Sequence, residues 1–536
     1  MSLTCVKTTY GWVKGTELTG AYDGIACFKA IPYAKPPVGK LRFAPPVPPE
    51  PWEGVLECNQ WPDIPLQNEL TGPAAMELYF EPMGRQSEDC LYINVHTPAC
   101  SPDEKLPVLL WYHDGGLTNG YAYDPRFQAK RMAKEGMVVV SVGHRLGTFG
   151  YLALPQLKAD DGCVGNYGFM DTLLGLEWVR DNVTAFGGDP DNVTLAGESG
   201  GTVKCCALAA CSQAKGMFRR VINQSGLQWK LQIDTEEQAF RRGQDFLRQL
   251  GLDPDISAEE LRALPVEKLM LPIDPHDLPG KISVDGKFFS GLFEDAMMAN
   301  IAGVDFLNVV CGGEGAPGYP AEYLNERGRI DSVQHFYDFY RQLLGPLYDE
   351  YDFERLVPVT VDNLARESFR IATLGLAPNV RSNVARNVML ARLFSKIHAQ
   401  AHPGSKAYTA RFWQLWPRRA DYDPENPAFE RTMAEHPLPP HGSDMWYSTG
   451  TLEEIDTPYR VWTKADHTAS QYFVQYLANF IKFGTPNGYD AALPSWPEEP
   501  MTFMDLCAVP QGHLNGEEPL DSLIEAFVRR EFHIDY

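Results

Sequence analysis

A short glycine-rich segment, GESGG at residues 197–201, carries the clearest chemistry in the sequence. It follows an apolar run, Val193–Ala196, and precedes an Ala- and Cys-rich stretch, Val203–Ala210, an order that predicts a strand, a tight turn and a helix. Glycines around a serine let such a turn close, and the hydroxyl is then raised at a helix N-terminus. An ordinary loop is the alternative for the motif taken alone. In this context the motif predicts Ser199 as a nucleophile that attacks a carbonyl carbon.

Attack on a carbonyl creates an oxyanion, which needs backbone N–H groups to stabilise its charge. One donor is expected from the residue after the nucleophile, Gly200. The others are expected from a glycine turn after an earlier strand, and the sequence HDGGL at 113–117 follows the apolar run ending at Tyr112. Gly115 and Gly116 are therefore the predicted donors, with an ordinary Gly-Gly turn as the alternative.

The surrounding elements must place these residues at one edge of a sheet. Four short apolar runs predict buried strands, at Leu106–Trp111, Met137–Val142, Val193–Ala196 and Phe306–Cys311. Helical patterns lie between strands, around Pro125–Lys134 and at 171–183, and late in the chain Phe473, Leu477 and Phe480 share one helix face that ends before Gly484. Strands alternating with helices predict an α/β fold with a central, mostly parallel mixed sheet flanked by helices.

The rest of the 536-residue chain is expected to decorate that sheet rather than to form further domains. The first fifty residues alternate turn signals with short apolar runs, which predicts a small N-terminal antiparallel sheet. Residues 230–300 and 320–400 are helix-rich and charged, and we expect them to be helical insertions that cap the functional edge. The whole chain, 1–536, is thus expected to be one domain.

Several further segments, taken together in this order, resemble the type-B carboxylesterase and cholinesterase family. They are QSEDCLYINV at 86–95, Arg145-Leu-Gly147, Phe149-Gly150, FGGDP at 186–190, the serine motif itself, and Asn479-Phe480 with Pro486-Asn487. The resemblance covers nearly the whole chain. It implies the α/β-hydrolase fold and a triad in the order Ser, Glu, His.

The resemblance places the triad acid at Glu314, in CGGEG after a predicted strand, and the triad base at His441, in HGSD. A loop after a strand end can position either group, so the residues are compatible with these roles. His436 is the rival histidine, but it lacks the Gly-Ser-acidic context. His441 would take the proton of Ser199, Glu314 would orient the imidazole, and water would later release the acyl group.

Three neighbouring residues carry open interpretations. Asp114 stands where the family usually has a first glycine, and it either makes a structural hydrogen bond or favours cationic substrates. Ser225 resembles a serine that lies behind the triad, and a structural serine at a strand end is the equal alternative. Glu198 is expected to be a buried ion-pair partner rather than a catalytic acid. Gly200 stands where the family often has alanine, and its N–H is retained.

Composition indicates which partners and which cellular compartment to expect. The chain has 70 acidic and 47 basic residues, a formal net charge of −23, which disfavours nucleic acids and anionic membranes as partners. Solvation of the surface and steering of cationic substrates both remain open explanations of that charge. The 11 cysteines and the absence of a signal-like N-terminal pattern predict a cytoplasmic protein in which Cys90 is reduced. The sequence carries no signal for an oligomeric state.

Three other functional classes compete with ester hydrolysis as interpretations of the sequence. The segment Gly313–Gly318 matches a dinucleotide-binding pattern, but Pro317 and Pro320 oppose the helix that this pattern requires. A catalytically inactive binding or adhesion module is disfavoured because all three triad positions are filled. A metal hydrolase is disfavoured because no clustered ligand motif appears, so no metal or cofactor is expected. Aryl esters, drug-like esters, lactones and thioesters are all candidate substrates.

Overall fold

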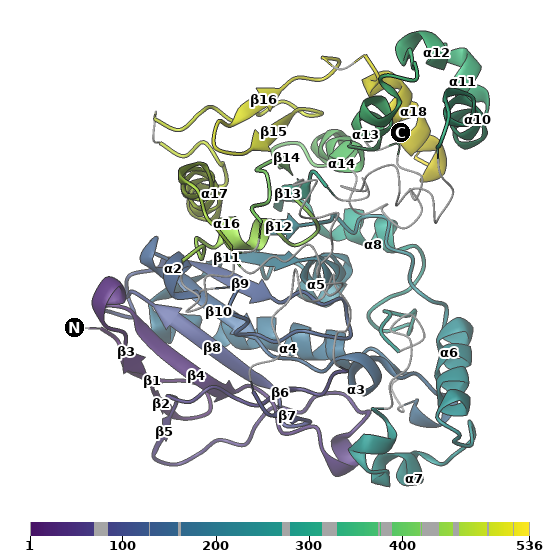
Figure 1. Cartoon of the computed structure of the whole chain (residues 1–536). Helices are drawn as coiled ribbons and strands as arrows, with labels where there is room; N and C mark the ends of the chain where they lie inside the picture. The colour runs from purple at the N-terminus through teal and green to yellow at the C-terminus, as the bar shows by residue number, and fades with distance from the viewer. Residues whose placement is uncertain are drawn as a thin grey trace. The chain divides into compact units, whose positions relative to one another are not determined.

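The computed structural model describes most of the chain. The described residues are 2–68, 84–127, 129–158, 162–270, 279–313, 330–373, 376, 388–418, 420, 439–453, 460–489, 492–517 and 519–534. They form two compact units (Figure 1). The first unit contains Met1–Thr71, Phe80–Asn223 and Gln228–Asp305, and the second contains Gly72–Tyr79, Gln224–Leu227 and Phe306–Tyr536.

Six strands lie side by side in the first unit, in the order β11-β9-β10-β8-β4-β3. Their bounds are Thr16–Glu17 for β3, Ala26–Pro32 for β4, Tyr92–Thr97 for β8, Leu106–Tyr112 for β9, Val138–Val142 for β10 and Gly188–Glu198 for β11. Strands β11, β9 and β10 are parallel, and the pairs beyond them are antiparallel. The sequence VVVSV of β10, apolar except for Ser141, is fully buried, as expected for a strand covered on both faces.

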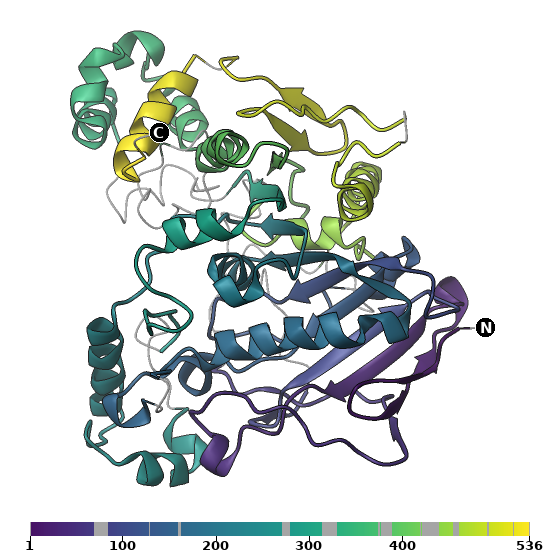
Figure 2. The same cartoon turned by 180° about the vertical axis from the view of Figure 1, so that it is seen from behind.

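Helices cover these strands. Their bounds are Ala129–Lys134 for α2, Gly147–Tyr151 for α3, Tyr167–Asn182 for α4 and Gly200–Ala210 for α5. Helix α5 packs on β11 and β9, and α2 packs on β10 and β8. Figure 2 shows α4 lying across one face of the same strands. Because α5 begins directly after β11, the residue between them is fixed by two packed elements.

The N-terminal sheet contains three strands, in the order β1-β2-β5. Their bounds are Cys5–Lys7 for β1, Trp12–Lys14 for β2 and Val55–Glu57 for β5, and the short strands β6 and β7 pair separately at Ile64–Pro65 and Gln86–Ser87. The pair β1–β2 is antiparallel, as expected. The pair β2–β5 is parallel, so this sheet is mixed rather than wholly antiparallel as expected; the long segment between the two strands allows the parallel pairing.

The described residues of the two stretches expected to be insertions contain several helices. Within 230–300 they are α6 at Glu236–Gln249, α7 at Ala258–Ala263 and α8 at Phe293–Asn300. Within 320–400 they are α10 at Val333–Leu344, α11 at Pro346–Glu350, α12 at Phe353–Leu356, α13 at Leu364–Thr373 and α14 at Val388–Ala401. The single-domain assignment for 1–536 stays a prediction.

The second unit has its own row of strands, in the order β16-β15-β14-β13. Their bounds are Asp305–Cys311 for β13, Ala407–Phe412 for β14, Phe503–Leu506 for β15 and Gln511–His513 for β16. Strand β12, at Arg220–Gln224, carries the chain from the first unit to the second, and α16, α17 and α18 lie at Asp444–Ser448, Lys464–Phe483 and Asp521–Glu531. Strands β13, β14 and β15 are parallel, so their carboxyl ends lie at one edge.

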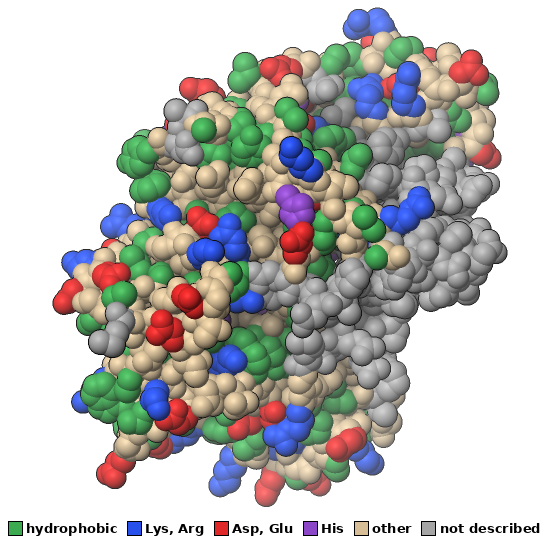
Figure 3. Space-filling model, turned by 60° about the vertical axis from the view of Figure 1, so that its left-hand side comes forward, with side chains coloured by type: hydrophobic (Ala, Val, Ile, Leu, Met, Phe, Trp, Pro, Cys, Tyr) green, Lys and Arg blue, Asp and Glu red, His purple; other side chains and the backbone are tan. Residues whose placement is uncertain are grey.

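Among the side chains coloured on the face that Figure 3 shows, Lys and Arg lie among Asp and Glu. Among the described helices, none is long and apolar enough to cross a bilayer.

Candidate active site

Ser199 occupies the turn between β11 and α5. Its backbone has φ 51° and ψ −111°, and it is the N-cap residue of α5. Non-glycine residues rarely adopt such a conformation, which costs about 1–3 kcal/mol and is found mainly at functional sites. A Cβ on Gly197 would lie 2.5 Å from the backbone carbon of Gly201, so the turn closes only with glycine there. The glycines of the motif are therefore required by close backbone approach.

The start of α5 packs directly against the turn that follows β9. A Cβ on Gly201 would overlap the carbonyl of Tyr112, and a Cβ on Gly200 would overlap the carbonyl of Gly116. The structure thus brings Gly200 and Gly116, two of the three predicted oxyanion donors, into direct backbone contact. It also explains why this chain has glycine at 200, where the resemblance leads one to expect alanine.

Replacing Gly200 with alanine tests that contact. The added methyl group would meet the Gly116 backbone, which cannot yield as a flexible side chain can. We expect Gly200→Ala to lower kcat for a 4-nitrophenyl ester by about 10- to 100-fold, because oxyanion donors lose their alignment. The KM should change little. Unchanged kcat in a folded variant would show that the turn accommodates a Cβ.

The turn itself also needs glycine. Gly115 and Gly116 have φ of 80° and 64°, in the left-handed region that favours glycine. The carbonyl of Gly115 accepts hydrogen bonds from the N–H groups of Asn119, at 2.9 Å, and Thr118, at 3.4 Å. These bonds orient the Gly115–Gly116 segment against the turn between β11 and α5 that bears Ser199, which we call the elbow.

Charged side chains are buried behind this turn. Asp114 is 1% exposed, and its carboxylate oxygen Oδ2 lies 2.7 Å from the Arg126 guanidinium. Burial raises the pKa of Asp114, and Arg126 opposes that effect. Arg126, also 1% exposed, forms a second ion pair of 2.7 Å with Asp124. The geometry favours a structural role for Asp114, because its carboxylate is already paired and hidden from solvent.

The sequence did not point to Lys204, which lies in the second turn of α5 and is 1% exposed. Its ammonium Nζ donates a 2.8 Å hydrogen bond to the carbonyl of His113. Burial lowers its pKa to about 7, opposed by the carboxylates of Asp114 and Glu198. Glu198, the last residue of β11, is itself fully buried. A lone lysine within an otherwise small and apolar helix was the available sequence signal.

In the second unit, two loops that carry predicted site residues are hydrogen-bonded together. Strand β13 ends at Cys311, and the N–H of Gly313 donates a 2.9 Å bond to the carbonyl of Pro439. Glu314 follows Gly313 directly but lies outside the described residues, as does His436. His441, two residues after Pro439, lies half-buried in the turn before α16. The bond therefore holds the segment leading to Glu314 beside the segment leading to His441.

The side chain of Ser225 forms hydrogen bonds with the segment that carries His441. Its backbone has φ 57°, and its hydroxyl Oγ donates a 3.3 Å hydrogen bond to Oδ1 of Asp444. The same Oγ accepts a 3.4 Å bond from the N–H of Gly442, the residue after His441. Gln224 donates a further 3.1 Å bond to Oδ2 of Asp444. Asp444 is the acidic residue of the HGSD motif noted in the sequence, whereas no sequence pattern pointed to Gln224.

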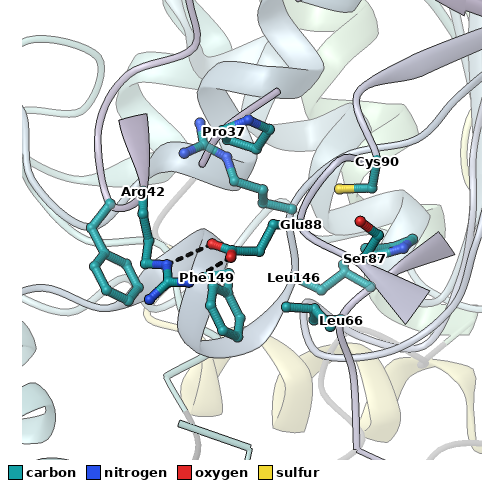
Figure 4. A pocket seen from close by; sticks show the side chains of 11 residues that line it. Pro37, Arg42, Leu66, Ser87, Glu88, Cys90, Leu146 and Phe149 are labelled. Carbon is teal, nitrogen blue, oxygen red and sulfur yellow. Dashed lines mark hydrogen bonds and ion pairs between the residues drawn. The ribbon is translucent and has the colours of Figure 1, made fainter. Parts of the chain in front are cut away.

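A small pocket in the first unit contains none of the predicted catalytic residues (Figure 4). It encloses about 250 Å³, including space open to solvent, and the bidentate Arg42–Glu88 ion pair crosses it with contacts of 2.6 and 2.5 Å. Cys90 lines it as a free thiol whose pKa is raised by burial. Across the described ranges, no group of three or more His, Cys, Asp or Glu side chains is placed to hold a metal ion.

Comparison with known proteins identifies the family. The model of the carboxylesterase family matches residues 2–511. The para-nitrobenzyl esterase of Bacillus subtilis (strain 168) is 39% identical over 286 residues, which are 53% of this chain and 55% of that protein. The alignment thus spans about half the length of that relative. The pyrethroid hydrolase Ces2e of Rattus norvegicus is 29% identical over 513 residues, 92% of this chain and 83% of that protein.

A solved structure of a PNB esterase is similar across 98% of this chain and 99% of its own, with 26% identity and a TM-score of 0.71. This likeness, with the mixed sheet and its flanking helices, confirms the predicted α/β-hydrolase fold. The family match extends over nearly all of the sequence, including the strand, turn and helix around Ser199. The chain belongs to the carboxylesterase family.

Proposed function

We propose that this protein hydrolyses small to medium carboxylic esters through an acyl-enzyme intermediate on Ser199. The observation that carries the proposal is the strained Ser199 backbone at the N-terminus of α5, with the Gly115–Gly116 turn packed against Gly200. A nucleophile and backbone donors held side by side are what acyl transfer requires. Membership of the carboxylesterase family supports the same chemistry.

In the proposed mechanism His441 removes the proton of Ser199 as the hydroxyl oxygen attacks the ester carbonyl. Glu314 orients the imidazole and stabilises its positive charge. The tetrahedral oxyanion accepts hydrogen bonds from the N–H groups of Gly115, Gly116 and Gly200 until the alcohol leaves. Water then attacks the acyl-enzyme, again with His441 as the base. The bond between Gly313 and Pro439 supports the pairing of Glu314 with His441.

The relatives guide the choice of substrates. One relative is named for para-nitrobenzyl esters and another for pyrethroids, both esters with an aromatic part. We therefore propose aryl and benzyl esters as the first class to examine. Separately, we propose a cytoplasmic location, because the odd set of 11 cysteines does not suggest a secreted disulfide framework. Both of these relatives carry the names of hydrolases, so the inactive binding module finds no support among them.

A fluorophosphonate titration tests the proposal directly, because this reagent phosphonylates an activated serine. Wild-type protein should release 4-nitrophenol from short-chain esters with an initial burst equal to the active-site concentration. One equivalent of fluorophosphonate should abolish that release, and mass spectrometry should locate the adduct on the peptide containing Ser199. Folded protein that neither turns over esters nor takes up the label would contradict the proposal.

A further inference from the structure

The buried lysine behind the oxyanion turn has no role in the mechanism above. Position 204 lies in the sequence GGTVKCCALAA of α5, where its neighbours are small or apolar. Burying an ammonium group costs several kcal/mol of desolvation, and an apolar side chain of similar volume would avoid that cost. A lysine retained there therefore calls for an explanation in what it contacts.

Its contacts converge on the segment that precedes the oxyanion donors. Nζ donates to the carbonyl of His113, 2.8 Å away and 91 residues earlier in the chain. The carboxylate of Asp114 attracts the ammonium, and Arg126 holds that carboxylate in place at 2.7 Å. On the other side, Glu198 precedes the nucleophile and also attracts Lys204. The side chain thus ties the elbow to the turn at their shared buried face.

We propose that Lys204 is a positioning residue for ester hydrolysis, whose ammonium group fixes the His113–Gly116 segment so that its N–H groups meet the oxyanion. This inference rests on the proposed function of that turn. The interaction is expected to matter most when the substrate oxygen acquires negative charge, because misaligned donors weaken transition-state binding more than substrate binding.

Lys204→Met tests the interaction between Lys204 and the carbonyl of His113, because methionine nearly keeps the volume of the side chain and removes its charge and its hydrogen-bond donor. We expect kcat for 4-nitrophenyl butyrate to fall about 10- to 100-fold, with KM within about threefold of wild type. The Ki of an aryl trifluoromethyl ketone, which forms an oxyanion adduct with the serine, should rise by the same factor as kcat falls. The matched control is Lys215→Met, which removes an exposed lysine bonded to the Ala299 carbonyl at 3.0 Å and should leave both constants unchanged.

The pH profile supplies a readout that a purely structural lysine would not move. The titratable groups facing Lys204 are His113, Asp114, His144, Glu198 and Cys205, with Arg126 and Asp124 behind Asp114. Burial lowers the pKa of Lys204 to about 7, and the Asp114 carboxylate opposes that effect. The charged form is therefore present at low pH and is lost as pH rises through about 7. We expect kcat to decline on that alkaline side in wild type and not in Lys204→Met.

Asp114→Asn keeps the lysine and removes its carboxylate, so the alkaline decline should move to lower pH, by about half a pH unit or more. This variant also tests the inference if Lys204→Met does not fold. A folded Lys204→Met with wild-type kcat and Ki, or a decline unmoved in Asp114→Asn, would overturn the inference. Ser199→Ala measured in parallel separates the two proposals, because its undiminished turnover would refute the proposed function itself.

Discussion

Replacing Ser199 with alanine should abolish ester hydrolysis. We expect kcat to fall by about 10⁵- to 10⁶-fold, because without the hydroxyl no acyl-enzyme forms, and the oxyanion donors and substrate binding alone retain only about 10³- to 10⁴-fold over the reaction in water. The fold should survive, since the packing of β11 and α5 involves the glycines on either side of the nucleophile. Release of 4-nitrophenol under pseudo-first-order conditions measures the loss.

A second serine in the same stretch provides the matched control. Ser212 lies exposed just after α5, and Ser212→Ala should retain full turnover and full fluorophosphonate labelling. Ser199→Ala should take up no label. If Ser199→Ala kept more than about 1% of wild-type activity, the catalytic nucleophile would have to be sought elsewhere.

Removing the imidazole of His441 should cost nearly as much. We expect His441→Ala to lower kcat by about 10⁴- to 10⁶-fold, because an unassisted serine hydroxyl is a poor nucleophile. Glu314→Gln should cost about 10²- to 10⁴-fold, since the imidazole stays present but loses the charge that orients and stabilises it. Steady-state kinetics of Ser199→Ala, His441→Ala and Glu314→Gln on one ester ranks the three losses of kcat.

Non-additivity supplies the sharper measurement. Because the three residues act as one unit, the double variant Ser199→Ala/His441→Ala should be no slower than Ser199→Ala alone. His436→Ala, the rival histidine, should retain wild-type kcat. A rate that falls with His436→Ala and not with His441→Ala would transfer the role of the base to His436.

Local patterns predicted the elements with one clear apolar face. Phe473, Leu477 and Phe480 predicted a helix ending before Gly484, and α17 has these residues buried and Gly484 at φ 77° after its last turn. Helix α4 begins at Tyr167, four residues before the predicted start at 171. Its first turn is buried on all sides, so no alternation of apolar and polar residues marks it.

Turn chemistry shortened the helix expected around Pro125–Lys134. Helix α2 instead starts at Ala129, because Asp124 organises a turn before it. Its carboxylate accepts a 2.8 Å bond from the N–H of Arg126, and its carbonyl accepts a 2.9 Å bond from the N–H of Phe127. Aspartate competes in this way with helical hydrogen bonding.

The candidate site likewise contains features that the sequence predicts and features that it does not. The elbow and its glycines could be predicted because their chemistry is local, confined to five consecutive residues. The bonds from Lys204 to His113 and from Gly313 to Pro439 join positions far apart in sequence, and no periodicity reports such contacts. The positive φ of Ser225 likewise gave no sequence signal, because serine at a strand end usually has an extended backbone.

The backbone conformation of Ser199 lowers the stability of the fold, whereas the proposed hydrolysis requires serine at this position. Its φ of 51° costs free energy that glycine at the same position would not incur. Ser199→Gly should therefore melt slightly above wild type, by up to a few degrees, while hydrolysing nothing. A search for thermostable variants guided by melting temperature alone would accordingly favour a variant that lacks the proposed activity, so any such search on this protein must score turnover alongside stability.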